Sequence, residues 1–328
     1  MAIKNQFYNK LSFIDNKKQI ESPSYISAIV QSDKELLQKA VLKFRSHSIN
    51  YEDSWGYVIQ ATRYGQFKWY DKSTGSLIFF GRKSDTDNTL VVATFFCELA
   101  YLKDALDRIL RIENGSKAII KNVTPQDVVK FVAYGFRPYK EDEQWLEEAP
   151  YDDQTYPQLV IGLQELTEMK RKPYRNLRTC LRKANQLNFR EYMESDKNQV
   201  LDIFALRDNI ISKDLNLRLK GMYYASHEMY PSSNIDKYVI TDNQTNEVLG
   251  FTAASDISPI STALVASIFR PSSKIESIWG MYQSMLVKYN QGFPKINIGG
   301  CETEGTFNFL RRTFRPIEKL EKTHLIYD

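Results

Sequence analysis

The chain has 328 residues, of which 42% are hydrophobic, so it is long enough and apolar enough to bury the cores of two domains of ordinary size. Charged residues make up 26% and the net charge is +4, a balance that excludes a generally basic nucleic-acid binder and confines any basic surface to a local region. The three cysteines lie far apart and none stands at a metal-ligand spacing, which favours a reduced protein without a metal.

Signals of secretion and of membrane insertion are missing from the sequence. The first residues lack an apolar core after their lysines, and the longest apolar stretch, 90–102, is interrupted by Thr94 and Glu98. We therefore expect a cytoplasmic protein without a transmembrane segment. Peripheral contact with anionic lipid stays open.

The first half of the chain begins with a helical lead-in over 1–50, followed by a predicted unit over 51–168. Its antiparallel strands are predicted at Gly65–Tyr70 and Ser76–Arg82, joined by the turn sequence DKSTG. A β-rich run at 89–96 precedes a helical pattern, a strand over 117–123 and a second helix. That helix is predicted to start at Thr124 as N-cap, with a proline at the first helical position.

A connector over 169–192 leads to a second predicted unit over 193–328. The elements of this unit are an antiparallel pair at Lys237–Asp242 and Val248–Ser255, a strand at 262–269, a helix containing Ile278 and Met285, a strand from Lys295, a helix at Gly305–Thr313 and a last strand at 323–328. Both units therefore follow the same order, with strand, helix, strand, helix and strand after an antiparallel pair.

The two units also share sequence. The runs TLVVATFF (89–96) and TALVASIF (262–269) are identical at four of eight positions. Further matches are Ser84 and Asp85 with Ser255 and Asp256, and Phe131, Phe136, Arg137 and Pro138 with Phe309, Phe314, Arg315 and Pro316. The matches keep their order along the chain and change offset only between elements, where loops tolerate insertion, so they indicate a diverged duplication.

This order of elements is the layout of the GNAT fold. Two such units with a basic helix between them resemble the DUF2156 family and the C-terminal catalytic region of phosphatidylglycerol lysyltransferases, and more distantly the Fem peptidyltransferases. The segments that carry the resemblance are KRKPYRNLRTCLRKANQLNF (170–189) and INIGGCETEGTFNFLRRTFRP (296–316). It implies an α/β (α+β) fold of two tandem GNAT-like units, each a mixed central sheet flanked by helices, and an acyltransferase activity.

The connector carries the sharpest charge feature of the chain, with eight basic residues and no acidic one between 169 and 190. The candidates for binding tRNA or another anion are Arg175, Arg178, Arg182 and Lys183. The three arginines would form one stripe of a helix, opposite an apolar face that includes Leu177. Two interpretations are open: a solvated helix, which the acidic segment 141–153 would neutralise, or a helix that contacts the phosphates of tRNA, a nucleotide or anionic lipid.

In the GNAT layout the donor slot opens where the fourth and fifth strands separate, and the loop after the fourth strand contacts a phosphate at a helix N-terminus. In the first unit this loop offers Lys103 and places Glu98 where a phosphate would lie. The donor-binding candidates of the second unit are Arg270, Ser272, Ser273 and Lys274 in this loop, with Gly299 and Gly300 after the fifth strand. We therefore predict that the second unit is active and the first a scaffold.

Acyl transfer also needs a group that takes a proton from the acceptor. Glu302 and Glu304 follow the glycine turn and are candidate general bases, although acids also suit a plain helix N-terminus. Asp256, at the end of the third strand, and Tyr327, on the final strand, are candidates for orienting the acceptor. Cys301 is either a nucleophile or a small buried residue. The three histidines show no metal or triad spacing, so we predict no metal site.

Three functions remain open. The first is an acyltransferase that moves an aminoacyl group from aminoacyl-tRNA to an amine, hydroxyl or peptide acceptor, favoured because neither loop carries the Gly-rich Q/RxxGxG/A pattern of coenzyme-A users. The second is an acyl-CoA-dependent N-acyltransferase, and the third is a non-catalytic binding protein on a degenerate transferase scaffold. We expect no tightly bound cofactor, a donor that is a co-substrate, and tRNA and a small-molecule or peptide acceptor as partners.

Overall fold

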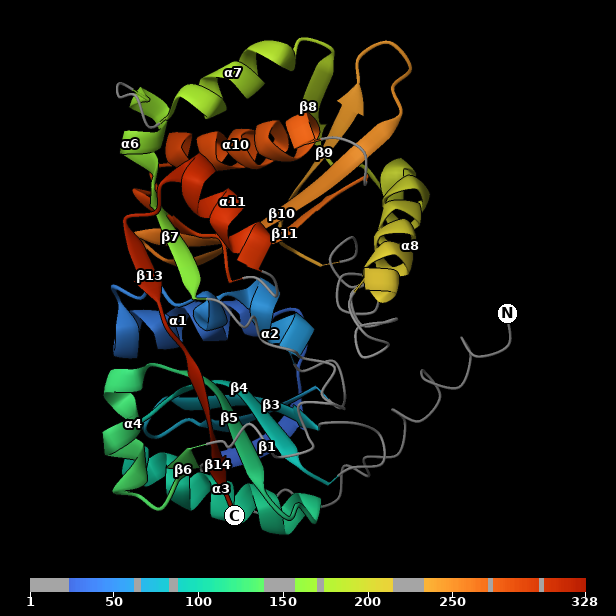
Figure 1. Cartoon of the computed structure of the whole chain (residues 1–328). Helices are drawn as coiled ribbons and strands as arrows, with labels where there is room; N and C mark the ends of the chain where they lie inside the picture. The colour runs from blue at the N-terminus through green and yellow to red at the C-terminus, as the bar shows by residue number, and fades with distance from the viewer. Residues whose placement is uncertain are drawn as a thin grey trace.

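The computed structural model describes residues 24–61, 66–82, 88–138, 157–169, 174–214, 233–270, 274–300 and 304–328. Within these residues the chain forms two mixed sheets of seven strands each, flanked by helices. Figure 1 shows the sheet of the second half above the sheet of the first half. The predicted α/β fold of two tandem units is confirmed.

The first sheet has the strand order β1-β2-β3-β4-β5-β14-β6. Its strands are β1 (Ser24–Ala28), β2 (Phe67–Asp71), β3 (Ser76–Arg82), β4 (Leu90–Phe96), β5 (Ala118–Val123), β6 (Arg137–Pro138) and β14 (Thr323–Tyr327). The helices of this half are α1 (Asp33–Arg45), the 3-10 turn η1 (Tyr51–Asp53), α2 (Trp55–Ala61), α3 (Leu99–Glu113) and α4 (Pro125–Val132). β4 and β5 run parallel, whereas the other neighbours are antiparallel.

The second sheet has the order β13-β7-β12-β11-β10-β9-β8. Its strands are β7 (Gln158–Gly162), β8 (Leu187–Glu191), β9 (Asp236–Asp242), β10 (Val248–Ser258), β11 (Ser261–Phe269), β12 (Lys295–Asn297) and β13 (Glu318–Leu320). The helices are α6 (Leu163–Glu168), α7 (Arg175–Lys183), the 3-10 turn η3 (Glu194–Asp196), α8 (Lys197–Asp214), α10 (Lys274–Asn290) and α11 (Glu304–Phe314). Here β11 and β12 form the parallel pair, so the two sheets repeat one topology.

The two halves exchange their last strands. β7 pairs with β12 and β13 of the second sheet, and β14 pairs with β5 and β6 of the first. Residues 321 and 322 alone separate β13 from β14, so the chain passes directly from one sheet into the other, as the long red segment in Figure 1 shows. The sheets therefore differ from the predicted unit boundaries at 158–168 and 323–328, because the local pattern of a strand does not specify which sheet takes it up.

Local signals account for the positions of most elements. β3 is buried on both faces, as is typical of a central strand, and matches the prediction for 76–82. On α3, Leu102, Leu106 and Ile109 are fully buried at helical spacing. Thr124 has extended backbone angles immediately before α4, and Pro125 is its first residue. The predicted helix start at Thr124 is therefore confirmed.

A hydrophobic cluster joins the two halves. α1 and α2 lie between the sheets in Figure 1, and their buried side chains, including Leu37 and Trp55, belong to one cluster with Phe251 and Val265 of the second sheet. At Gly56 a Cβ atom would lie 2.7 Å from a Val265 methyl carbon, so this contact leaves room for glycine only. The halves are therefore packed as one body.

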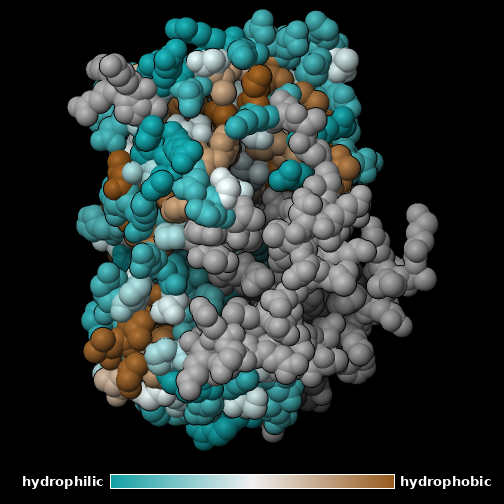
Figure 2. Space-filling model, in the orientation of Figure 1, coloured by the Kyte–Doolittle hydropathy of each residue, from teal (hydrophilic) through white to brown (hydrophobic). Residues whose placement is uncertain are grey.

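The basic connector forms α7, which packs on α10 and α11. Its exposed cations are Arg175, Arg182 and Lys183. Leu177 is fully buried on the other face, as predicted. Arg178 is only partly exposed and donates a hydrogen bond to the Met169 carbonyl oxygen. Hydrophilic colours in Figure 2 follow the top of the molecule over α7. The apolar face of α7 therefore packs on the second half, and its cationic face is exposed to solvent.

Two further surface features bear on membrane contact. No helix in the ranges given above is both long and apolar enough to cross a membrane. The brown patch at the lower left of Figure 2 lies over α4, where Val129 is 77% exposed and Val132 48%. These apolar residues therefore lie on the first half of the chain, away from the cations of α7.

Candidate functional site

Each sheet opens where its two parallel strands separate. The paired segments are Leu90–Val92 with Ala118–Ile120 in the first sheet, and Ser261–Ala263 with Lys295–Asn297 in the second. Just past this point each fourth strand carries a β-bulge, at Ala93 in β4 and at Val265 in β11. A bulge bends its strand and interrupts the hydrogen-bond ladder. Both sheets therefore have the separated parallel strands beside which the donor slot was predicted.

In the second half, Arg270 and Lys274 lie between the end of β11 and the first turn of α10. Arg270 forms an ion pair with Glu247, and the Lys274 ammonium lies 5.0 Å from the centre of the Phe309 ring on α11. The N–H groups of a helix N-terminus attract anions, and these cations add to that attraction. The other two predicted residues of this loop, Ser272 and Ser273, lie outside the described residues.

The glycine turn follows β12 directly and is held by a neighbouring amide. Gly299 has a φ of 73°, and its N–H donates to Asn297 Oδ1 at 2.8 Å. Its carbonyl oxygen accepts from the N–H of Leu159 on β7, at 3.0 Å. The turn at Gly299 and Gly300 is therefore fixed to both β12 and the exchanged strand β7.

The acids predicted as general bases follow this turn. Glu304 is exposed at the start of α11, and its carboxylate accepts a hydrogen bond from the Asn308 amide at 3.2 Å. This arrangement is typical of an acid in the first turn of a helix. Glu302 and Cys301 lie in the part of the chain that the structure does not describe.

Asp256 lies near the other end of α10. Its carboxylate is 2.8 Å from the ammonium of Lys288, a side chain that is 1% exposed and that also contacts Asp236. Lys274 and Lys288 are 14 residues apart on this helix, or about 21 Å at 1.5 Å per residue. Asp256 therefore joins the ends of β9, β10 and α10, and the structure does not bring it together with Lys274.

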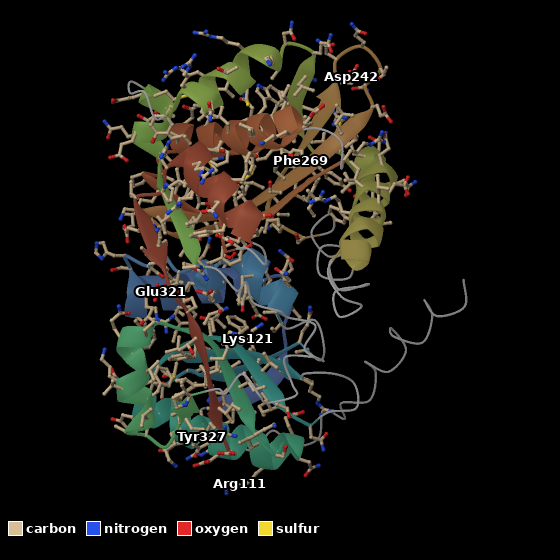
Figure 3. All side chains as sticks on the ribbon, in the orientation of Figure 1. Arg111, Lys121, Asp242, Phe269, Glu321 and Tyr327 are labelled. Atoms are coloured by element: carbon tan, nitrogen blue, oxygen red, sulfur yellow. The ribbon has the colours of Figure 1, made fainter. Side chains whose placement is uncertain are left out.

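Tyr327 is predicted to lie in the second half, and the structure places it in the first. Its hydroxyl donates to Asp107 Oδ1 at 2.5 Å, and the centre of its ring lies 4.9 Å from the centre of the Phe136 ring. Figure 3 shows Tyr327 near the lower end of the molecule, far from Phe269 at the end of β11. The predicted position of Tyr327 in the second half is therefore wrong, because β14 crosses into the first sheet.

A cleft of about 120 Å³ lies in the first half, at the point where β4 and β5 separate. Its lining residues are Arg45, Asn50, Glu52, Asp53, Ala93, Thr94, Phe95, Lys121, Asn122, Val123, Thr124, Asp127, Phe131 and Lys322. They come from α1, η1 and the residue before it, both strands, α4 with the residue before it, and the segment that crosses to β14. The half predicted as a scaffold therefore contains a polar opening.

β5 is irregular where it borders this cleft. Asn122 has a φ of 58°. Lys121 and Asn122 of β5 together lie opposite the single residue His324 of β14. The Asn122 N–H donates to His324 Nδ1 at 3.1 Å, and its amide donates to the Tyr57 hydroxyl at 2.9 Å. A left-handed residue inside a strand is uncommon and is found more often near functional sites. Lys121, 4% exposed, lines the cleft, and Figure 3 shows it near the boundary between the halves.

Glu52 is a buried acid of the cleft. It is 5% exposed, and its carboxylate accepts hydrogen bonds from the Gln158 amide and, at 3.2 Å, from the Lys322 ammonium. Burial raises the pKa of the Glu52 carboxyl, and the nearby Lys322 opposes that shift. A buried carboxyl with a raised pKa is suited to exchange a proton with a ligand.

Asp53 has a different role. One carboxylate oxygen accepts from Arg45 and Thr94, each at 2.9 Å, and the other accepts from Ser48 at 2.6 Å. The Arg45 guanidinium also lies 5.0 Å from the centre of the Phe95 ring. Asp53 therefore anchors η1 to β4.

The segment that carries these acids also covers the bulge of the second sheet. The Tyr51 hydroxyl donates to the carbonyl oxygen of the bulge residue Val265 at 3.2 Å. Gly56 packs on the same valine, and its N–H donates to Ser255 Oγ at 3.1 Å. Residues 48–56 therefore line an opening in the first sheet and fill the equivalent place in the second.

A chain of buried side chains connects the cleft with the glycine turn. Gln158, which binds Glu52, accepts from Asn297 Nδ2 at 2.9 Å. The same Asn297 amide donates to the Ile49 carbonyl oxygen at 2.8 Å, and its Oδ1 accepts from Gly299. Glu52 is thus joined to the end of β12 through two side chains.

Sequence reasoning missed the charged residues of this cleft. Glu52 and Asp53 interrupt the aromatic run from Tyr51 to Tyr57, and Lys121 interrupts an apolar strand. Charged residues inside apolar segments are rarely buried without a partner, so these interruptions were the available signal. Among the residues with described positions, no group of His, Cys, Asp or Glu could hold a metal ion.

No model of a known protein family matches the sequence, and no curated protein matches it significantly. Solved structures do match. FemX has a TM-score of 0.60 and 11% identity, over 92% of this chain and 97% of that chain. The C-terminal DUF2156 domain of a putative lysylphosphatidylglycerol synthetase from Agrobacterium fabrum has a TM-score of 0.58 and 11% identity, over 90% and 92%.

A tandem GNAT protein from the clavulanic acid biosynthesis pathway has a TM-score of 0.52 and 8% identity, over 93% of this chain and 98% of that chain. At these identities the likeness shows the fold alone. The chain has the tandem GNAT fold, and the resemblance to DUF2156 and Fem structures expected from its sequence is confirmed.

Proposed function

We propose that the chain is an acyltransferase that moves an aminoacyl group from aminoacyl-tRNA to an amine or hydroxyl acceptor. The observation that carries the proposal is the cationic face of α7, a helix that has no acidic residue and packs on α10. Phosphate contacts by exposed arginine and lysine provide most of the affinity for nucleic acid. The lysylphosphatidylglycerol synthetase domain of the same fold, whose name describes an aminoacyl product, supports this choice.

The proposed donor site is the N-terminal end of α10. Arg270 and Lys274, with Ser272 and Ser273 between them in the sequence, would hold a backbone phosphate near the acylated end of the donor there. Gly299 and Gly300 would allow the donor backbone to approach the end of β12. The loop lacks the Gly-rich pattern of coenzyme-A users, which favours a tRNA donor over acyl-CoA.

The chemistry is an ester aminolysis or transesterification. The acceptor nitrogen or oxygen attacks the ester carbonyl carbon, a bond to the acceptor forms, the ester C–O bond breaks, and the tRNA hydroxyl leaves with a proton. A carboxylate that takes the proton of the acceptor speeds this step. For an acceptor bound on the second half, Glu302 and Glu304 are the proposed bases.

The test is tRNA retention at low salt by a variant in which Arg175, Arg182 and Lys183 become glutamate. We expect at least a tenfold loss of affinity and a salt dependence shallower by about two to three counterions. A control with the same charge change replaces the exposed Lys39, Arg108 and Arg111 of the first half by glutamate and should retain tRNA within about threefold.

Three results would contradict the proposal. Equal retention by both variants would show that α7 does not contact tRNA. Thermal stabilisation of the chain by acetyl-CoA, without any retention of tRNA, would favour the acyl-CoA-dependent reaction instead. A chain that binds neither ligand would be a binding protein on a transferase scaffold.

A further inference from the structure

The cleft of the first half has room for a small molecule. Its volume is about 120 Å³, whereas an engineered cavity of about 150 Å³ accepts benzene, so a ligand of roughly five or six non-hydrogen atoms fits. The cleft lies at the carboxyl ends of the parallel strands β4 and β5, which is the edge where open sheets bind ligands.

The lining of the cleft is electrically balanced. It contains three basic residues, Arg45, Lys121 and Lys322, and three acidic ones, Glu52, Asp53 and Asp127. A ligand with a single charge would disturb this balance in a largely buried site, and an unbalanced buried charge is costly. A ligand that carries one positive and one negative group preserves it.

Two groups of the lining are available for such a ligand. The Lys322 ammonium has three N–H donors and uses two of them, toward Asn50 Oδ1 at 3.1 Å and Glu52 Oε2 at 3.2 Å. The Glu52 carboxylate accepts one side-chain hydrogen bond on each oxygen, and each oxygen has a second lone pair. A donor and an acceptor are therefore adjacent in the cleft.

We propose that this cleft binds a small α-amino acid such as glycine or alanine, with its ammonium beside Glu52 and its carboxylate beside Lys121 and Lys322. The size and charge balance of the cleft select this class of ligand. The inference deepens the proposed function, on which it rests for one point: it identifies the acceptor as the amine of the bound amino acid.

Glu52 then has a defined part in the transfer. Its carboxylate takes one proton from the bound ammonium, and the free amine attacks the ester carbonyl of the donor. The C–N bond forms, the ester C–O bond breaks, and the second proton of the nitrogen goes to the departing tRNA oxygen. The link through Gln158 to Asn297 sets the position of Glu52 relative to the turn at the end of β12.

The first test compares three probes on the unmodified full chain by calorimetry. Glycine carries both charges, glycolate lacks the ammonium and ethanolamine lacks the carboxylate. We expect glycine to bind at least tenfold more tightly than either single-charge probe. Equal binding of glycolate or ethanolamine, or no binding of glycine to the folded chain, would overturn the inference.

The second test locates the binding. Glu52→Gln and Lys121→Met each remove one charge and keep the shape of the side chain, and each should weaken glycine binding at least tenfold. Glu35→Gln and Lys39→Met change exposed residues of α1 outside the cleft and should leave binding unchanged. Equal affinity in all four variants would place the ligand elsewhere, and the probe series still decides if the cleft variants fail to fold.

These measurements separate the inference from the proposed function. Glycine binding needs no donor, so a chain that retains tRNA but binds no amino acid contradicts the inference alone. A chain that binds glycine but no tRNA contradicts the proposed donor alone.

Discussion

The two halves of the molecule repeat one sheet but differ at the opening of that sheet. Both have a parallel pair in the same place and a bulge just past it. In the first half this region borders a cleft, whereas in the second half Tyr51 and Gly56 cover the bulge residue Val265. Duplication therefore kept the scaffold and made the openings unequal.

The difference has a simple structural cause. A single segment, 48–56, lies between the two bulges, and it presents different side chains to each. Glu52 and Asp53 face the first opening, and the Tyr51 hydroxyl reaches the second. Because one segment serves both sheets, the two openings cannot be equivalent.

The largest expected effect comes from breaking the exchange of strands. Removal of residues 323–328 deletes β14 from its place between β5 and β6, where Leu325 and Ile326 are fully buried. Each buried side chain contributes about 1.5–3 kcal/mol, and the deletion also removes the strand with which β6 pairs and exposes one edge of β5. We expect the chain to lose cooperative thermal unfolding, measured by circular dichroism.

Removal of Asp328 alone is the control for this deletion, because that residue is exposed. It should unfold like the full chain. If the chain without 323–328 instead unfolded cooperatively at an unchanged temperature, the halves would be independent of the exchanged strand, and their description as one body would be wrong.

A smaller effect is expected at the contact between the halves. Gly56→Ala would place a methyl group 2.7 Å from a Val265 methyl carbon, so the free energy of unfolding should fall by about 2 kcal/mol. Gly305→Ala on α11 meets no atom within 4 Å and should leave stability unchanged or slightly raised. Urea unfolding measures the free energy of unfolding of both variants. If Gly56→Ala left that free energy as little changed as Gly305→Ala does, the contact between the halves would be loosely packed.

The elements were predictable from the sequence because their signals are local. The apolar spacing on α3, the Thr124–Pro125 helix start and the amphipathic pattern of α7 each lie within one element. The repeated runs at 89–96 and 262–269 also form equivalent strands, β4 and β11. Such patterns need no knowledge of the partner against which an element packs.

The exchange and the cleft were not predictable, because both depend on distant residues. The last strand, 323–327, pairs with β5 and β6, about two hundred residues earlier in the chain, and nothing in its own sequence distinguishes the two sheets. Likewise, Glu52 meets Gln158 and Lys322 only after both exchanged strands are in place. Tyr327 was misplaced for the same reason.

The turns after β2 and β9 are another repeated feature, and they differ in burial. Asp71 and Asp242 each accept a hydrogen bond on Oδ1 from the N–H two residues later, at 2.8 Å. Such Asx turns hold the two hairpins in the same way. Asp71 is 5% exposed and also accepts from the Tyr101 hydroxyl at 2.8 Å, whereas Asp242, labelled on its turn in Figure 3, is partly exposed.

The pKa shifts of the two acids have the same direction. Burial acts to raise the pKa of Asp71, but hydrogen bonds from Ser73 and Tyr101 outweigh it and lower the pKa to about 2. The pKa of Asp242 is lowered by hydrogen bonds from the backbone N–H groups of its turn, of which the Thr245 N–H contributes most, followed by the Gln244 N–H. A lowered pKa in the folded state stabilises the fold above the ordinary value of 3.8, and this stabilisation is lost as the pH falls.

The smallest expected effect is the difference between Asp71→Asn and Asp242→Asn. At pH 7, Asp71→Asn should lower the free energy of unfolding by about 1 kcal/mol, because it removes charge-assisted hydrogen bonds in a buried place. Asp242→Asn should lower it less, since water replaces the lost bonds. Urea unfolding from pH 7 to pH 2 should show the Asp71→Asn deficit shrinking below pH 4 and disappearing near pH 2. A deficit that is independent of pH would mean that asparagine fails to fit the turn, and burial would then not distinguish the two halves at this position.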